Sequence, residues 1–535
     1  MSDFDNFQYE SSILSGETAL SNFYKVKNFS IPDVNNGQYA SGEVQFSMPS
    51  LSTQDAHCNL SDSYIQFPYS ITVSADQVIA GAEKAVSLKG SFLSLVSSFS
   101  LRIDNQQVLT KSDFNNIPMH FDIISKSTAN DTVNYHEEIN FALDDEQTTD
   151  YIAAVGEHNL AGNAALVTRN AKIGYNPANA RRAKFTDINK TTRSHKSNVV
   201  VTAQLVTYNV LVSIPLKHLS PVFAKAQLVK GAFIELYMNI NSGSTSFTVT
   251  KTAGADGQVA VTLGEVGAVT TSPKFEVLPF MIDPTKMTCL RGAGGDTVST
   301  ITVTGGISTN TNLSLKSAMF HAKLYQMKPE VESSYASSIP SKKIDYCAYH
   351  VYTQKAVATT GKVRLQIINS AQKMRHLIIH TCIAESINGS TTGATPSVGN
   401  GASAYSPLAS PFSSAPLTCC PEGSFSSFQV YVSGKPMFES PMEYSYEMFK
   451  EQYRNSNLAI DGDMSGLLNE KSWSEGYGYI FIDLMRKKND AEDLVNQSLE
   501  IEFYNNTTCP IDVRCFLAQE ETIELTTQTG KVVRS

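Results

Sequence analysis

The sequence is poor in cysteine and tryptophan, has no long apolar run and carries no excess of basic charge. Eight cysteines among 535 residues are too few for a disulfide scaffold, and none forms a CxxC pair at zinc spacing with a second pair or a histidine. We therefore expect reduced thiols in an intracellular folding environment. No run of about 18 apolar residues predicts a membrane span, and the acidic first residues lack the blocks of a signal peptide. The formal net charge of −9 argues against nucleic-acid binding over the whole chain.

Sequence signatures of catalysis are also missing. The chain contains no GxxxxGK(S/T) phosphate loop, no GxSxG nucleophile elbow and no HExxH zinc motif. His376 and His380 stand four residues apart, but the segment between them is typical of a strand, where this spacing separates two residues by roughly 13 Å. Asp461 and Asp463 are typical of a surface loop, with a Ca²⁺ site as the alternative. We predict no enzyme and no catalytic, cofactor-binding or metal-binding residue.

Apolar and polar residues alternate in segment after segment, which is typical of antiparallel sheets with one buried face. In residues 206–214 every second side chain is apolar, and residues 234–240 repeat the pattern. Residues 112–124 and 216–229 are expected to be helices, the second beginning after Pro215. The pattern predicts an all-β chain of antiparallel sandwiches with short helices in the connections.

The chain is expected to contain two sandwiches, because 535 residues exceed one ordinary core. Periodicity is lost and serine and proline increase over residues 329–342, which predicts a linker. Glycine- and threonine-rich insertions at 242–272, typical of a hairpin, and at 291–312 are expected to be functional or exposed contact loops. The expected organisation is an N-terminal arm at 1–40, a first sandwich at 41–328, the linker, a second sandwich at 343–525 and a C-terminal tail at 526–535. The arm is interpreted either as a disordered tail or as a segment that orders against a neighbouring subunit.

Several motifs carry a resemblance to a known family. In the second half they are SPF at 410–412, FQVYVSG at 428–434, YSYEMF at 444–449, and LLNEKSW at 467–473 before a strand at 477–484. In the first half they are VSIPLKHL at 212–219 and LVKG at 228–231. These motifs, in this order, resemble the double jelly-roll major capsid proteins of polinton-like viruses and virophages.

The resemblance implies a fold of two consecutive antiparallel jelly-roll β-sandwiches, at 41–328 and 343–525, and a structural role as a major capsid protein. It implies homotrimers that form pseudo-hexagonal capsomers and tile an icosahedral shell around a double-stranded DNA genome. The implied partners are further copies of the chain, neighbouring capsomers, and penton and minor capsid proteins. The implied location is the virion, assembled inside the host cell.

Charge is unevenly distributed between two neighbouring segments. Residues 137–157 hold seven acidic side chains and no Lys or Arg, whereas residues 169–196 hold eight basic side chains and one acidic one. Solvated faces are the simplest interpretation. The alternatives are that the two segments meet across subunit contacts, through Arg181 and Arg182 among others, or that the basic segment contacts genome DNA weakly.

A carbohydrate-binding or adhesive β-sandwich protein, such as a minor capsid or spike component, is the alternative function. Two features argue against it. No signal peptide is expected, and Trp473 is the only tryptophan, whereas sugar-binding faces usually present exposed aromatic rings.

Overall fold

The computed structural model describes both halves of the chain, apart from several segments between and within them. The described stretches, which contain short gaps, are residues 3–15, 22–75, 86–128, 199–253, 259–265, 277–282, 297–307, 317–383, 425–485 and 495–534. The SPF motif at 410–412, the charged side chains of 137–157 and 169–196, and Asp461 and Asp463 lie outside the described residues.

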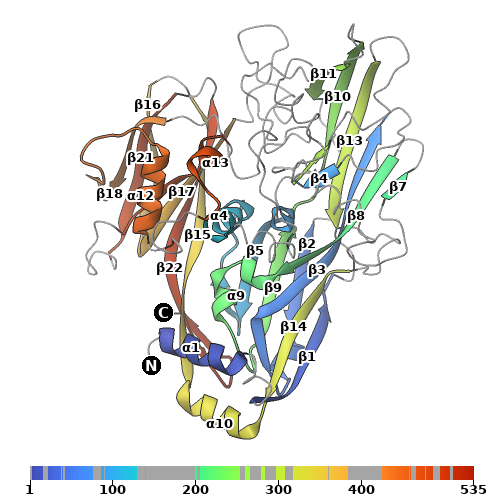
Figure 1. Ribbon diagram of the computed structural model, residues 1–535, viewed down its shortest axis with the longest axis vertical. Coiled ribbons are helices and arrows are strands. Elements are labelled where there is room, and N and C mark those ends of the chain that lie inside the picture. Colours follow the sequence, from blue (N-terminus) through green and yellow to red (C-terminus); the bar gives the residue numbers. More distant parts are fainter. Residues whose placement is uncertain are drawn as a thin grey trace.

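The first half of the chain forms a sandwich of two antiparallel sheets (Figure 1). Its framework strands, in chain order, are β1 (Phe23–Pro32), β2 (Glu43–Met48), β3 (His57–Ala75), β5 (Val96–Ile103), β6 (Gln106–Leu109), β8 (Leu205–Pro215), β9 (Ile234–Ile240) and β14 (Met319–Met327). One sheet has the order β1-β14-β3-β8, and the other has the order β2-β9-β5-β6. Numbered along the chain, these strands lie in the orders 1-8-3-6 and 2-7-4-5, which is the jelly-roll arrangement of two Greek keys.

The second half repeats this strand order. Its strands are β15 (Ser341–Val357), β16 (Lys362–Ala371), β17 (Met374–Ile383), β18 (Phe425–Val432), β19 (Lys435–Pro436), β20 (Ile480–Asp483), β21 (Gln497–Asn505) and β22 (Ile511–Thr526). The sheets are β15-β22-β17-β20 and β16-β21-β18-β19, again 1-8-3-6 and 2-7-4-5. The predicted fold of two consecutive antiparallel jelly rolls is therefore confirmed.

Further strands extend the first jelly roll at one end. The hairpin expected in 242–272 is present as β10 (Gly243–Ala253) and β11 (Val259–Glu265). It joins the sheet through β13 (Thr297–Ile307), which pairs with both β10 and β3. Short strands complete this end: β7 (Val199–Val201) beside β8, and β4 (Val86–Leu88) beside β12 (Phe280–Ile282).

Helices lie in equivalent connections of the two jelly rolls. Between strands five and six, the first has α4 (Asn116–Lys126) and the second has α12 (Tyr446–Asn455) and α13 (Glu470–Glu475). The other helices of the described residues are α1 (Asp3–Leu14), α3 (Pro49–Ser52), α9 (Pro221–Lys225) and α10 (Pro329–Ser338), with 3-10 turns at Phe92–Leu95 and Leu216–His218.

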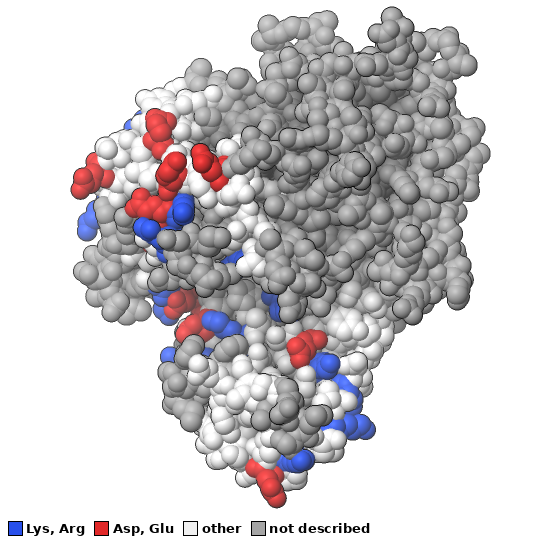
Figure 2. All heavy atoms as spheres, viewed as in Figure 1, with Lys and Arg blue, Asp and Glu red and all other residues white. Residues whose placement is uncertain are grey.

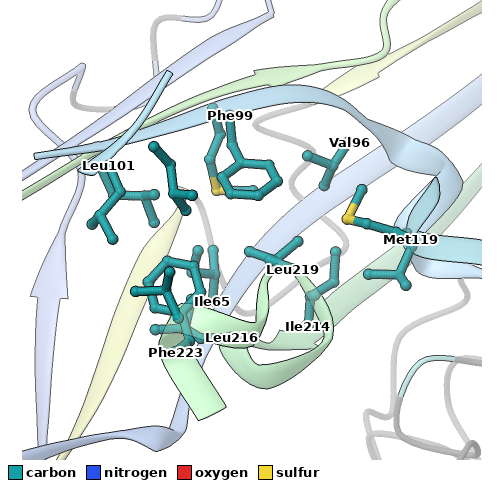
Figure 3. Close-up of a cluster of buried hydrophobic side chains, with 14 of the residues drawn as sticks. Ile65, Val96, Phe99, Leu101, Met119, Ile214, Leu216, Leu219 and Phe223 are labelled. Atoms are coloured by element: carbon teal, nitrogen blue, oxygen red, sulfur yellow. The ribbon is translucent and has the colours of Figure 1, made fainter. Parts of the chain in front are cut away.

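The core of the first jelly roll is filled from both sheets and from the connection after β8. Figure 3 shows Leu216, Leu219 and Phe223 from this connection beside Ile65 of β3 and Leu101 of β5. These side chains are almost completely buried. The alternation along β3 and β5 places Ile65 and Leu101 on the inward faces of the two sheets.

The structure divides the expected helix at 216–229 into two pieces. The 3-10 turn Leu216–His218 is followed by α9, which begins at Pro221 after the extended N-cap residue Ser220. The Ser220 hydroxyl accepts a hydrogen bond from the Val222 amide. A serine N-cap followed by proline is a helix start, so it interrupts a continuous helix here. The helix expected at 112–124 begins later, at Asn116.

The chain ends are more structured than the expected arm, linker and tail. The segment 1–40, expected to be an arm, contains the helix α1 and the strand β1, which pairs with β14. The segment 329–342, expected to be a linker, is mostly the helix α10. The segment 526–535 contains β23 (Val532–Arg534), which pairs with β22. The strand β1 and the helices α1 and α10 have weak sequence patterns, because few of their side chains are buried.

Candidate assembly interface

The two jelly rolls meet at helix α4, which lies between them in Figure 1. Pro118 stands in the first turn of the helix. Amide groups there have no carbonyl partner within the helix, so the lack of an amide hydrogen in proline costs no helical hydrogen bond. Its apolar residues are buried on both sides of the helix, toward the first core and toward the second jelly roll. The core of the first domain therefore continues without interruption into the contact with the second.

Phe121 of α4 is the centre of an aromatic cluster from the second jelly roll. Its ring stacks on Phe481 of β20, with centroids 5.7 Å apart and planes at 11°. Tyr479 and Tyr453 meet it edge-on at 4.9 and 6.0 Å, and Phe449 of α12 does so at 6.5 Å. Each well-oriented aromatic pair adds about 0.5–1.5 kcal/mol beyond its buried area, so this cluster is a principal source of interdomain stability.

The C-terminal end of α4 is capped by the other domain. The last carbonyls of a helix have no partner within it. The Leu467 amide donates to the Ile124 carbonyl at 2.8 Å, and the Tyr453 hydroxyl donates to the Ser125 carbonyl at 3.3 Å. Gly466 (φ +63°) brings the chain to this helix end, where a Cβ at this position would stand 2.4 Å from the Ser125 carbonyl oxygen. Only glycine fits this approach.

A buried ion pair holds the base of the molecule together. Lys342 of β15 and Glu10 of α1 are 4% and 2% exposed, and the Lys342 Nζ lies 2.7 Å from the Glu10 Oε1. The hydroxyl of Tyr335, in α10, donates to the same carboxylate. Burial lowers the pKa of Lys342, and Glu10 opposes that effect. The N-terminal helix, the linker helix and the second jelly roll are therefore joined through one carboxylate.

The C-terminal turn closes against the first jelly roll. Gly530 (φ +64°) packs so closely that a Cβ would stand 2.4 Å from the Ala232 nitrogen. Tyr346 of β15 donates its hydroxyl hydrogen to the Val108 carbonyl of β6. The two jelly rolls thus form one body, fixed at α4 and at the base.

The outward face of the second jelly roll's first sheet is covered at its centre by α4 of the first jelly roll and by its own helix α12. Ile378, Phe481 and Phe516 lie side by side across β17, β20 and β22, and each is fully buried. They belong to the apolar cluster of the first domain, whereas their sequence neighbours fill the second core.

The equivalent face of the first jelly roll has no such cover among the described residues. We call it the open face and define it by Val26, Ser30, Tyr64, His321 and Tyr325, which are cross-strand neighbours on β1, β14 and β3. The Tyr64 ring stacks on His321 at 4.5 Å, and the Ser30 hydroxyl lies 2.8 Å from the His321 Nδ1. Val26 is 49% exposed.

The two histidines considered from sequence lie on β17, as expected of a strand. His376 stacks on Phe481 at 5.1 Å and hydrogen-bonds to the Tyr349 hydroxyl at 3.2 Å. Burial lowers the pKa of His376 and of His380 to about 3. Both therefore stay neutral in the interior at neutral pH.

No metal cluster of three His, Cys, Asp or Glu occurs within the described stretches, and none of their helices is long and apolar enough to cross a membrane. The described cysteines are free thiols, namely Cys58, Cys347, Cys382 and Cys515. Sequence reasoning located the strands of the resemblance motifs but missed Phe121, Gly466, Glu10 and Lys342. Their partners lie hundreds of residues away, so no local pattern marks them.

No protein-family model matches the chain, and no curated protein matches its sequence. Solved viral structures are similar over most of its length. A 3.5 Å cryo-EM structure of the Sputnik virophage has 11% sequence identity, covers 96% of this chain and 89% of that chain, and gives a TM-score of 0.47. The mavirus major capsid protein has 8% sequence identity, covers 95% of this chain and 90% of that chain, and gives a TM-score of 0.44. The Faustovirus major capsid protein has 11% sequence identity, covers 93% of this chain and 90% of that chain, and gives a TM-score of 0.45. The strand orders by themselves establish that this chain is a double jelly-roll protein.

Proposed function

We propose that this chain is a major capsid protein, a structural subunit whose three copies form a pseudo-hexagonal capsomer. Jelly rolls occur in viral capsids and in lectin-like domains. The observation that carries the proposal is that one sheet face is covered in the second jelly roll and open in the first, although the two domains share the same strand order.

The contact between the two jelly rolls within one chain is the basis for the proposed contact between copies. Within the chain, the helix between strands five and six of one jelly roll packs on the outward face of the next. In the second jelly roll, α12 of the same connection packs Phe449 and Tyr453 inward against α4 and β20, so this connection offers its polar side to another copy. The open face belongs to the first jelly roll. A contact of this connection with the open face of another copy is a heterologous interface. Such interfaces close into a ring of three chains when each of the six jelly rolls is rotated by about 60° relative to the one before it.

Charge supports this pairing of surfaces. Figure 2 shows acidic side chains gathered over the second jelly roll and basic ones along the lower right edge, where Figure 1 draws β1. Exposed acidic residues near α12 include Glu443 and Glu447. Lys323 of β14 lies between His321 and Tyr325 on the side of the open face. Complementary charge on two surfaces favours their association and fixes its orientation.

The wider assembly follows from the sequence resemblance. We propose that capsomers tile an icosahedral shell around double-stranded DNA, with neighbouring capsomers and penton and minor capsid proteins as further partners. The location is then the virion, after assembly inside the host cell. Weak genome contact is assigned to the basic segment at 169–196.

The mass of the purified protein in solution tests the proposal. A trimer of 58.4 kDa chains has a mass of about 175 kDa, and light scattering distinguishes it from a monomer. Tyr64→Glu on the open face is expected to yield folded monomers. Its matched control is Tyr504→Glu, at a tyrosine that is 40% exposed on β21. A monomeric native protein, or a trimer that survives Tyr64→Glu unchanged, contradicts the proposed ring.

A further inference from the structure

The outward face of the first jelly roll's second sheet contains a polar hollow of about 310 Å³. Its floor comes from three neighbouring strands. Glu43, Asn239 and Ser98 form one row across β2, β9 and β5. Tyr237 and Ser100 form part of the next row. Residues two apart on a strand share a face, so all these side chains point to the same side.

Cationic groups border this hollow. Arg102 lies with its guanidinium carbon 5.9 Å from the Tyr237 ring centroid, and its Nε donates to Gln107 at 2.9 Å. Lys111 follows β6 and is exposed. Among the described residues, neither the Lys111 ammonium nor the Glu43 carboxylate has a side-chain partner.

The corresponding sheet of the second jelly roll contrasts with it. There Lys362 pairs with Glu502 and Arg364 pairs with Glu500, each at 2.5 Å. Arg364 also lies over the Tyr431 ring at 4.9 Å. The charges on that face neutralise one another, whereas the hollow of the first jelly roll leaves donors and acceptors available.

We propose that this hollow binds a carboxylated saccharide, such as a uronic acid or sialic acid unit. The guanidinium of Arg102 is planar and forms two parallel hydrogen bonds with a carboxylate, and Lys111 adds a second positive charge. Ser98, Ser100, Asn239 and Glu43 supply donors and acceptors for hydroxyl groups. The Tyr237 ring offers a flat apolar surface to the sugar ring.

A peptide ligand fits this place less well. Extended peptides bind by adding a strand to a sheet edge, and helical peptides bind in apolar grooves. The hollow lies on the face of a sheet and is lined mainly by polar side chains. Its polar groups all belong to one chain, so the site is complete without a second copy.

Titration of the purified full-length protein with sialyllactose, a glucuronate trisaccharide and neutral lactose tests the site, with binding followed by calorimetry. At least one acidic sugar is expected to bind, and lactose is expected to bind about tenfold more weakly or not at all. Arg102→Gln is expected to weaken binding about 10- to 100-fold. Arg364→Gln, on the paired face, is the matched control and is expected to leave binding unchanged.

Several results overturn the site. They are absence of binding by both acidic sugars, equal binding of lactose, equal loss in both arginine variants, and tighter binding of a hexaglutamate peptide than of either sugar. If Arg102→Gln fails to fold, Lys111→Gln replaces it, because Lys111 is exposed and makes no contact that folding requires. Unchanged sugar binding in that variant then counts against the site.

Discussion

Substituting Gly466 by alanine tests whether the second jelly roll really caps α4. Two effects act at this position. The backbone has φ +63°, and the added Cβ would stand 2.4 Å from the Ser125 oxygen and 2.6 Å from the Ile124 oxygen. Both contacts are with backbone atoms, so no side-chain rotation relieves them. The helix end or the approaching chain must move, which breaks the hydrogen bond from Leu467 to Ile124.

The expected loss of stability has two parts. An alanine in the left-handed region costs about 1–2 kcal/mol. A lost hydrogen bond that leaves a buried carbonyl without a partner costs about 1–3 kcal/mol more. Gly466→Ala is therefore expected to lower the free energy of unfolding by about 2–5 kcal/mol. Gly434 has φ +75° and no atom within 4 Å of its added Cβ, so Gly434→Ala isolates the first part alone.

Denaturant unfolding measures the difference through the fluorescence of the only tryptophan. Trp473 donates its indole hydrogen to the Tyr479 carbonyl at 2.8 Å, beside the aromatic cluster of the interface. We expect Gly466→Ala to shift the transition further than Gly434→Ala, or to separate it into two steps as the jelly rolls uncouple. Equal shifts in the two variants refute the close packing of this chain segment on α4.

The remaining predictions concern the other buried contacts. Phe121→Ala is expected to cost about 3–5 kcal/mol, because it empties the centre of the aromatic cluster, and calorimetry measures this. Glu10→Gln leaves the Lys342 charge buried without its counter-charge, and we expect it to lower the free energy of unfolding by about 3–5 kcal/mol. The double variant Glu10→Gln/Lys342→Met is expected to recover most of this loss, because it removes the buried charge as well. Burial lowers the pKa of His376 and His380 to about 3, below the ordinary value of 6.5. Between pH 6.5 and 3 the unfolded chain binds protons on these rings that the folded chain does not bind. The free energy of unfolding is therefore highest above pH 6.5 and falls as the pH is lowered toward 3, by about 1.4 kcal/mol per ring and pH unit. Denaturation at pH 7 and 5.5 checks this dependence, and a flat profile contradicts it.

Sequence patterns predicted the strands well because each buries one face. β8 and β9 alternate over their whole lengths, and the segment before β20 was recognised from its resemblance motif. β15, the first strand of the second jelly roll, begins at Ser341, within the segment 329–342 where the sequence pattern predicts a linker. These features depend on neighbours along the chain.

The interface could not be predicted in the same way. Phe121 looks like any apolar residue of an amphipathic helix, and nothing local shows that its partner is Phe481. Glu10 lies in a weakly patterned segment, and only the fold brings it to Lys342. Strand order has the same character, because alternation shows that a strand exists but not which strand it pairs with.

The pairing of β1 with β14 has a consequence for synthesis of the chain. Phe23 lies opposite Met327, so the first strand of the jelly roll is made about 300 residues before β14, its one partner among the described strands. At about 5–20 residues per second, that edge waits roughly 15–60 s on the ribosome. During this interval Glu10 also lacks Lys342, and α4 lacks its cap. Nascent chains therefore expose an unpaired strand edge during this interval, and such an edge is a template for pairing with another chain.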